Sequence, residues 1–270
     1  MNMAFDIETQ DYSRFTFSRD DRVLTAWITS DHPVNGVDAP MHDELARIFT
    51  DLQRDGGSDI VVLAAKGRAF CAGGDFDWFQ EQIDHPARFR DIAWDAKRIV
   101  GSLLEMEKPI LCRLHGAAAG LGATIALLCD IIVADETAKI GDPHVKVGLV
   151  AGDGGTLIWP QLIGFARAKE LLMTGDMLTG AEAKDLGLVN HALPANQLDA
   201  KLDEIIGKLT ANPKWAVRWT KTVTNIPLRA LAAQMMDAAI GWESVSNTLK
   251  DRQESVSAMA ERRAAVLTGE

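Results

Sequence analysis

The chain has 270 residues, of which 47% are hydrophobic and 24% are charged, shares typical of a folded globular protein and not of a disordered or fibrous one. Its formal net charge of -10 argues against nucleic acid and anionic membrane surfaces as partners, since such binding depends on clustered Lys and Arg. No apolar run approaches the roughly 20 residues that a membrane helix needs, so we expect no membrane partner.

The expected compartment is the cytoplasm. Residues 1–15 carry three acidic residues in place of the basic end and apolar run of a secretory signal. The cysteines, Cys71, Cys112 and Cys129, are odd in number and lack the spacing of a zinc or redox motif. They fit a reducing environment.

Apolar runs rich in Val, Ile and Leu alternate with helical patterns along the first part of the chain. Strands are predicted at residues 23–28, 60–65, 110–114 and 131–134. Helices are predicted at residues 41–54, 87–106 and 121–129. This alternation predicts an α/β fold in which most strands pair in parallel.

The composition changes near residue 195. Nineteen of the 22 glycines lie before residue 196, and the remainder consists mostly of helix-forming residues, with helices predicted at 197–210, 214–224 and 228–250. An apolar stripe recurs on the last of these helices at three- and four-residue steps: Leu228, Leu231, Met235, Ala238 and Trp242. Such a stripe must pack on the first part of the chain or on a neighbouring subunit.

Two glycine-rich runs, residues 67–75 and 115–123, each follow a predicted strand. Unpaired amides at a helix start attract negative charge. Two such amides aimed at one point would form an oxyanion hole, which stabilises a transition state by several kcal/mol. Tight turns and close helix packing explain the same glycines without any function, so the runs alone leave both interpretations open.

Four ordered motifs resemble the crotonase (enoyl-CoA hydratase/isomerase) superfamily. They are Phe70-Cys71-Ala72-Gly73-Gly74-Asp75, the second glycine run with Cys129-Asp130, residues 148–156, and Leu172-Met173-Thr174-Gly175. The resemblance covers nearly the whole chain. It implies an α/β spiral of ββα units with the active site in residues 1–195, followed by a helical region, residues 196–270, that assembles a homotrimer or a hexamer.

By the same resemblance, the enzyme acts on acyl-CoA substrates, with coenzyme A as part of the substrate and no tightly bound cofactor. The amides of Gly74 and Leu121 would form the oxyanion hole. Relatives mostly carry glycine where this chain has Leu121, but a backbone amide supplies the hydrogen bond in either case. Ala72 and Asp75 would contact the substrate. Asp75 and Asp77 lack a third ligand at suitable spacing, so no metal is expected.

The chain departs from the family's hydratases at two catalytic positions. Where those enzymes hold a water molecule with two glutamates, this chain has Thr124 and His144. A threonine hydroxyl is not a base near neutral pH, so the paired-carboxylate mechanism does not carry over and Thr124 becomes a candidate substrate contact. His144 titrates near physiological pH, and Asp153, nine residues later, would fix its tautomer and raise its basicity. We predict that these two residues are catalytic; caps of a loop and of a helix are the alternative interpretation.

The pair His144 and Asp153, with Ile158-Trp159-Pro160 after it, resembles the branch that contains 6-oxocamphor hydrolase, which cleaves a carbon–carbon bond in a β-diketone. His42 and Glu243 match that branch more weakly as substrate-binding residues, and plain surface positions are the alternative for both.

Among the aromatic residues, Trp78 and Trp159 are the ones expected to line the pocket. Arg218 and Lys221 could meet a coenzyme A phosphate, although a solvated helix face explains them as well.

Three functions follow. The first is an acyl-CoA-processing enzyme of enoyl-CoA hydratase/isomerase type, in which the oxyanion hole stabilises a thioester enolate and His144 and Asp153 move protons. The second is a C–C bond hydrolase that acts on a β-diketone without coenzyme A. The third is a catalytically silent binding or scaffolding trimer, which the histidine–aspartate pair disfavours because neither residue is needed for the fold.

Overall fold

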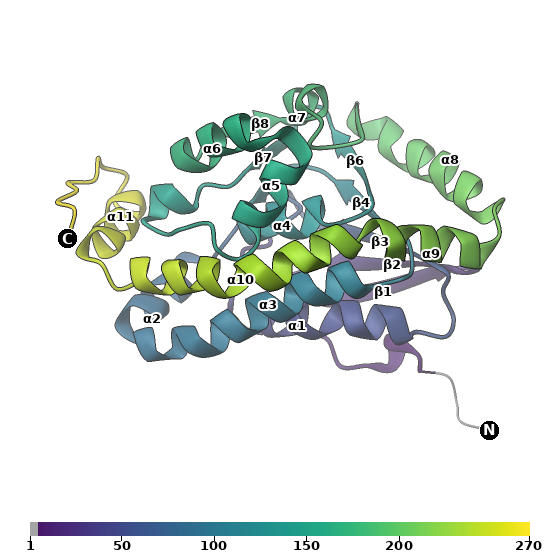
Figure 1. Ribbon diagram of the computed structural model, residues 1–270, viewed down its shortest axis with the longest axis horizontal. Coiled ribbons are helices and arrows are strands. Elements are labelled where there is room, and N and C mark those ends of the chain that lie inside the picture. The colour runs from purple at the N-terminus through teal and green to yellow at the C-terminus, as the bar shows by residue number, and fades with distance from the viewer. Residues whose placement is uncertain (1–4) are drawn as a thin grey trace.

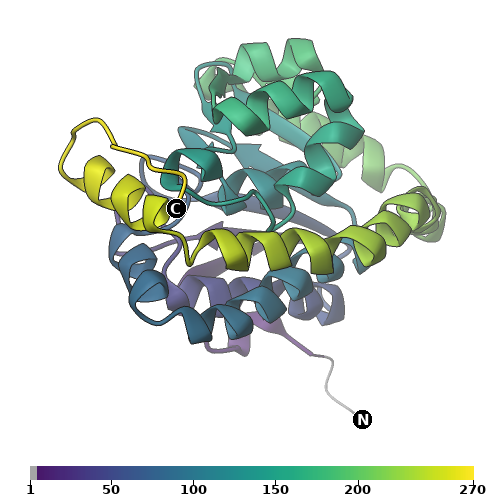
Figure 2. The ribbon, with the colours of Figure 1, turned by 60° about the vertical axis from the view of Figure 1, so that its left-hand side comes forward.

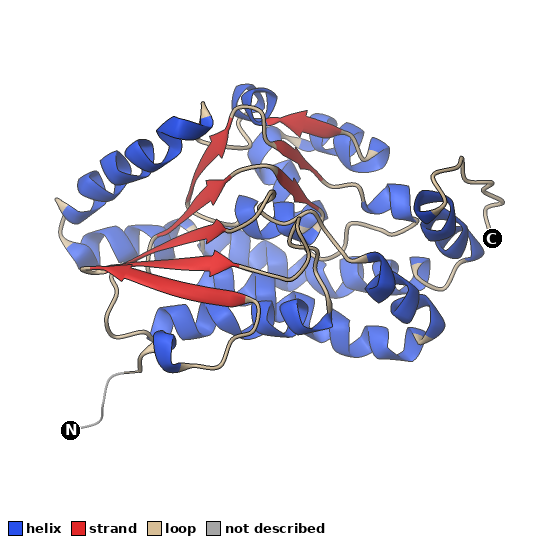
Figure 3. Ribbon diagram, turned by 180° about the vertical axis from the view of Figure 1, so that it is seen from behind, coloured by secondary structure: helices blue, strands red, loops and turns tan. Residues whose placement is uncertain are grey.

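The computed structural model describes residues 5–270, and its centre is a six-stranded sheet with helices on both faces (Figures 1 and 3). The strand order is β1 (Phe15–Asp20), β2 (Val23–Ile28), β3 (Ile60–Ala65), β4 (Ile110–Leu114), β6 (Ile131–Asp135) and β9 (His191–Leu193). Strands β1 and β2 pair antiparallel, and the other neighbours in this sheet pair in parallel. Three short strands, β5 (Ala117–Ala119), β7 (Lys139–Gly141) and β8 (Met177–Thr179), form a second sheet.

Alternate residues of β3 build two separate cores. Val61, Leu63 and Ala65 join the larger core, which also contains buried residues of α1 (Ala39–Arg54) and α3 (Phe89–Glu105). Their neighbours Ile60, Val62 and Ala64 pack with buried residues of α8 (Leu198–Thr210) on the opposite face. Because both faces are covered, the strand reads as one continuous apolar run.

Shorter helices fill the space beside the sheets. They are α2 (Phe76–Asp84), α4 (Leu121–Leu127), α5 (Gly155–Ile163), α6 (Phe165–Thr174) and α7 (Gly180–Leu186), together with 3₁₀ turns at Ile7–Thr9, Pro86–Arg88, His144–Val147 and Ala195–Gln197. Helix α1 begins two residues before its predicted start, because the Asp38 side chain accepts a hydrogen bond from the Met41 amide and caps the helix there.

The C-terminal helices pack back against helices α2 and α3 of the first part of the chain. After α9 (Lys214–Thr224), α10 (Ile226–Ser246) lies along α3, and α11 (Lys250–Ala260) packs against α2 (Figures 1 and 2). The buried face of α10 consists of Ala232, Met236, Ile240, Glu243 and Ser246. This face is shifted from the predicted stripe: Leu228, Leu231 and Met235 are half-buried at its margin, whereas Ala238 and Trp242 are exposed. Within residues 5–270, no helix is both long enough and apolar enough to span a bilayer.

Candidate functional site

A cavity of about 200 Å³ lies between α2, α3, α4, α10 and α11. Its lining includes four residues singled out from the sequence as chemical groups: Gly74, Leu121, His144 and Asp153. Ala72 and Trp78, predicted as substrate contacts, line it as well. Residues that are far apart along the chain therefore meet at one place.

Gly74 and Leu121 both line this cavity, and the hydrogen bonds among the described residues around them leave their backbone amides uncovered. Gly74 bridges Val37, but that bridge uses the amides of Val37 and Asp75 and not the amide of Gly74. Leu121 is the first residue of α4, whose N-terminal neighbour is a glycine without a capping side chain. Within residues 5–270, neither amide donates a hydrogen bond to the protein, so both can donate to a bound oxygen atom.

The glycines around these amides are also required by packing. A Cβ atom at Gly74 would stand 2.1 Å from Cε1 of Phe79, and one at Gly122 would stand 2.3 Å from the Cys71 carbonyl oxygen. Gly120 has a φ of 54°, a conformation that residues with a side chain rarely adopt. Both interpretations of the glycine runs therefore apply at the same positions: the chain segments approach closely, and the close approach leaves amides uncovered.

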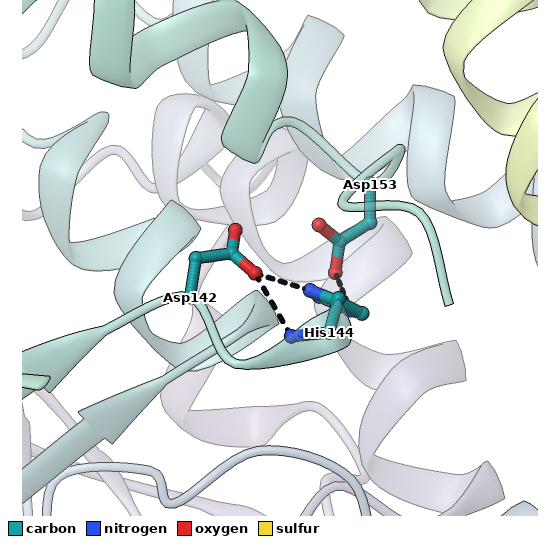
Figure 4. Close-up of side chains that lie close together, drawn as sticks. All are labelled: Asp142, His144 and Asp153. Atoms are coloured by element: carbon teal, nitrogen blue, oxygen red, sulfur yellow. Dashed lines mark hydrogen bonds and ion pairs between the residues drawn. The ribbon is translucent and has the colours of Figure 1, made fainter. Parts of the chain in front are cut away.

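His144 lies between two carboxylates (Figure 4). Its Nδ1 is 2.5 Å from Oδ1 of Asp142, and its Nε2 is 3.5 Å from Oδ2 of Asp153. The carboxylate that orients the imidazole ring is therefore Asp142, for which no role was predicted, while Asp153 faces the other nitrogen. The sequence did contain a signal for this contact. An Asp followed by a Pro favours a turn in which the Asp side chain bonds to groups two residues later. The His144 amide nitrogen accordingly lies 3.4 Å from Asp142 Oδ1.

These ionisable groups shift one another's pKa values. Burial would lower the pKa of His144, but the negative charges of Asp142 and Asp153 overcome this and raise the pKa to about 10. Burial raises the pKa of Asp153, against the opposing effect of the His144 charge. Burial, and next the charge of Asp153, raise the pKa of Glu243 to about 8. These shifts favour a charged imidazole and a protonated Glu243 at neutral pH, so His144 is better suited to donate a proton than to accept one.

His42 and Glu243, for which a surface position was the alternative, both line the cavity and are only 5% and 7% exposed. The His42 ring packs against Trp78, with ring centroids 5.3 Å apart. Burial lowers the pKa of His42 to about 4, so this imidazole is neutral.

Three predicted substrate contacts lie outside the cavity lining. Trp159 is fully buried in the larger core, where the apolar pattern of α5 directs it. Thr124 is also fully buried, with its methyl group so near Gly154 that a Cβ there would stand 2.6 Å away. Asp75 caps α2 by accepting hydrogen bonds from the amides of Asp77 and Trp78.

Arg218 and Lys221 are also placed differently from the expectation that they meet a coenzyme A phosphate. Arg218 Nη2 is 2.9 Å from Asp59 Oδ1, and Lys221 Nζ is 2.8 Å from Asp130 Oδ2. Both side chains are buried, so these ion pairs hold α9 against the large sheet.

Asp142, His144 and Asp153 offer ligand atoms that lie within 4.8 Å of one another, as a metal site would require. The imidazole does not suit this use, because Nδ1 bonds to Asp142 and the raised pKa keeps the ring protonated. Metal ligation requires a neutral imidazole. The three residues fit a proton-transfer group better.

Known proteins are similar to this chain over most of its length. A family model described as enoyl-CoA hydratase/isomerase matches residues 22–270. The enoyl-CoA isomerase/hydratase fer4 of Mycosarcoma maydis is 33% identical over 213 residues, which cover 78% of this chain and 76% of that protein.

Two solved structures are similar as well. An enoyl-CoA hydratase/isomerase from Mycobacterium paratuberculosis has a TM-score of 0.87 and 32% identity, covering 92% of this chain and 99% of that one. A β-diketone hydrolase from Anabaena sp. PCC 7120, solved with (S)-3-oxocyclohexyl acetic acid, has a TM-score of 0.82 and 28% identity, covering 88% and 95%. The predicted α/β fold with its helical C-terminal region is confirmed, and the chain is an enzyme that belongs to the enoyl-CoA hydratase/isomerase family of the crotonase superfamily.

Proposed function

We propose that the enzyme processes an acyl-CoA thioester by moving a proton at the carbon beside the thioester carbonyl, in a reaction of hydratase or isomerase type. The observation that carries this proposal is that one cavity presents both the uncovered amides of Gly74 and Leu121 and the pair His144–Asp153. A carbonyl oxygen held by the two amides would accept the negative charge of an enolate. Coenzyme A enters as part of the substrate.

In this proposal Asp153 accepts the proton and His144 donates one. The raised pKa of Asp153 makes its carboxylate a stronger base than an ordinary aspartate. The charged imidazole, oriented through Nδ1 by Asp142, has its Nε2 proton on the Asp153 side, where it can protonate a carbanion. In hydration, the water oxygen would bond to the β-carbon while Asp153 takes the water proton and His144 protonates the α-carbon. In isomerisation, the proton leaves one carbon and returns to another.

Deuterium exchange tests this chemistry without knowledge of the product. Butyryl-CoA incubated with the enzyme in D₂O should gain deuterium at the α-carbon, as measured by mass spectrometry. His144→Ala should slow the exchange by about 10²-fold or more. Leu121→Ala keeps the amide and should keep the exchange, while truncation of this buried side chain lowers stability by about 2–5 kcal/mol. Absence of exchange in the unaltered enzyme, or full exchange in His144→Ala, would refute the proposal.

A second candidate is hydrolysis of a carbon–carbon bond in a β-diketone without coenzyme A. It is favoured by the presence of His42 and Glu243 in the cavity lining and by the similarity to the Anabaena enzyme named a β-diketone hydrolase. Water would lose a proton to Asp153 and attack one carbonyl carbon; the bond to the central carbon would break, and the resulting enolate would take a proton from His144. Turnover of cyclohexane-1,3-dione, together with no calorimetrically detectable binding of acyl-CoA esters, would favour this second function over the first.

We further propose that the enzyme is a cytoplasmic homotrimer or hexamer. Apolar side chains left exposed on the C-terminal helices support assembly: Trp215, Trp219, Val223, Ile226 and Trp242. A silent scaffolding role is disfavoured because burying Asp142, His144, Asp153 and Glu243 together costs stability, and such a cluster has no use in a scaffold.

A further inference from the structure

The apolar wall of the cavity determines which groups fit beside the reacting carbonyl. Helix α2 contributes the rings of Phe76, Trp78 and Phe79, and the start of α3 contributes Phe89 and Ala93. Four aromatic rings therefore surround a cavity of about 200 Å³.

This volume limits the substrate. A protein cavity of about 150 Å³ lined by apolar side chains binds benzene. A cavity of about 200 Å³ therefore has room for one six-membered ring and its carbonyl.

The rings lie close to the oxyanion hole. The edge of Phe79 lies against Gly74, where an added Cβ would be 2.1 Å from Cε1. The Phe76 and Phe79 rings meet edge to face, with centroids 6.1 Å apart. A group attached to a carbonyl held by the Gly74 amide therefore meets aromatic surface at once, and flat rings pack well against such surface.

One part of the wall, on α3 and α10, is tightly packed. Phe89 is 3% exposed and Ile240 is 4% exposed, so both belong to the packed core and cannot move aside without cost. Lys146, a cation in the lining, lies 3.5 Å from Asp176. On the polar side the two carboxylates of Asp142 and Asp153 outnumber the one imidazolium of His144, so a second carboxylate on the substrate would be repelled.

We infer that the substrate carries a compact, uncharged carbocyclic group, one six-membered ring attached to the reacting carbonyl directly or through one carbon. This inference rests on the proposed carbonyl chemistry and adds the class of group beside the carbonyl. It applies equally to a ring-bearing thioester and to a ring-bearing diketone, because both place the ring beside a carbonyl held by the same amides.

Isothermal calorimetry with two thioesters of equal carbon number tests the inference. Cyclohexylacetyl-CoA should bind at least about tenfold more tightly than octanoyl-CoA, a difference of about 1.4 kcal/mol. Equal affinity, or tighter binding of octanoyl-CoA, would overturn the inference.

Variants of the wall provide a second test. Ala93→Leu narrows the cavity. It should lower the affinity for cyclohexylacetyl-CoA at least tenfold and leave the affinity for acetyl-CoA unchanged. Phe89→Ala widens the cavity and should bring the octanoyl-CoA affinity up to that of the ring ester. Phe165→Ala on α6 is the control, because Phe165 is 64% exposed and lies outside the lining. This variant should leave the affinity for both esters unchanged. Should Phe89→Ala fail to fold, Ala93→Leu decides alone, and unchanged binding of the ring ester in that variant would contradict the inference.

The thioester proposal can fail separately. If neither ester binds, 1-cyclohexylbutane-1,3-dione and decane-2,4-dione are compared in the same way, since they have equal carbon number and need no coenzyme A. Preference for the ring then supports the inference while the thioester proposal is lost. Preference for the linear diketone, equal affinity, or no binding of any of the four compounds would overturn the inference.

Discussion

Asp142 controls the orientation and charge of the His144 imidazole. Its carboxylate bonds to Nδ1 and lies against the start of α5, where a Cβ at Gly155 would stand 2.0 Å from Asp142 Oδ2. We expect Asp142→Asn to slow α-proton exchange by about 10²-fold or more, because the imidazole loses both its orientation and its charge. NMR titration should show a lower pKa for His144 in this variant. Asp176→Asn is the control. Unchanged exchange in Asp142→Asn would show that Asp153 alone positions the ring.

Proton binding in the cavity should make stability depend on pH. The pKa of His144 is raised from 6.5 to about 10 and that of Glu243 from 4.5 to about 8, so the folded state binds these protons more tightly than the unfolded state. Their contribution is complete below the unfolded values and is lost as pH rises through the folded values. We expect the free energy of unfolding, measured with urea, to fall from about pH 4.5, the unfolded value of Glu243, to about pH 10, the folded value of His144.

Glu243→Gln separates the two groups. The glutamine cannot titrate, so the decline toward pH 8 should become shallower while the decline toward pH 10 persists. Glu261→Gln, an exposed change near the end of the same helical region, serves as the control. A flat profile in the unaltered enzyme would contradict the assigned protonation states.

Residue type and spacing identified part of the site, whereas other residues depend on distances in space: Asp142 was missed, and His42 and Glu243 were named only by a weaker resemblance. His144 and Asp153 stand in one short segment, and the glycine runs mark both amides. Glu243 and His42 reach the cavity only because α10 and α1 pack against α3, which no local pattern reveals. Trp159 was predicted to line the pocket but lies in the core. Its residue type could not decide between the two, since a large aromatic ring suits a core as well as a pocket.

Helix α11 is fastened beside the site by one buried arginine. Arg252 is fully buried; its Nη1 donates to the Val147 carbonyl at 2.6 Å, in the turn that begins at His144. Its guanidinium lies 4.6 Å from the centroid of the Phe79 ring. We expect Arg252→Met to lower the free energy of unfolding by about 1.5–3 kcal/mol, because a charged hydrogen bond is lost. α-Proton exchange should slow too, because the turn that carries His144 loosens.

Arg263→Met provides the matched comparison in urea denaturation. Arg263 lies just beyond α11 and pairs with Glu254 at the exposed surface, so its loss should change stability little. Equal losses of stability in the two variants would mean that the buried contacts of Arg252 contribute no more than the exposed ion pair of Arg263.

The long elements were predictable and the short ones were not. Strands β2, β3 and β4 occupy the residues predicted for them: the apolar runs of β3 and β4 are buried on both faces, and β2 alternates buried with half-buried residues. Strands β5, β7 and β8 have three residues each, too few to show a period, and exist through pairing with one another. On α10 the period indicated a helix correctly, but contact with α3 selects the buried face.

At the scale of the whole molecule, the exposed apolar residues of α9 and α10 require a partner surface. Trp215, Trp219, Val223 and Ile226 follow one another at helical spacing and are 49–63% exposed. We expect sedimentation equilibrium to show a trimer or hexamer at micromolar concentration, and Trp219→Lys to shift it toward smaller species. A monomeric unaltered enzyme would contradict assembly through these helices. Removal of residues 226–270 should give insoluble protein.

The cavity takes its lining from Val37 at one end of the chain to Met259 at the other. A ribosome releases these residues in order, so the nascent chain can form the large sheet and even the His144 turn while the cavity still lacks a side. Helices α10 and α11 emerge last, and Ile240, Glu243 and Met259 close the wall only then. We therefore expect a chain that ends before α10 to form most of the fold and still to lack a complete cavity.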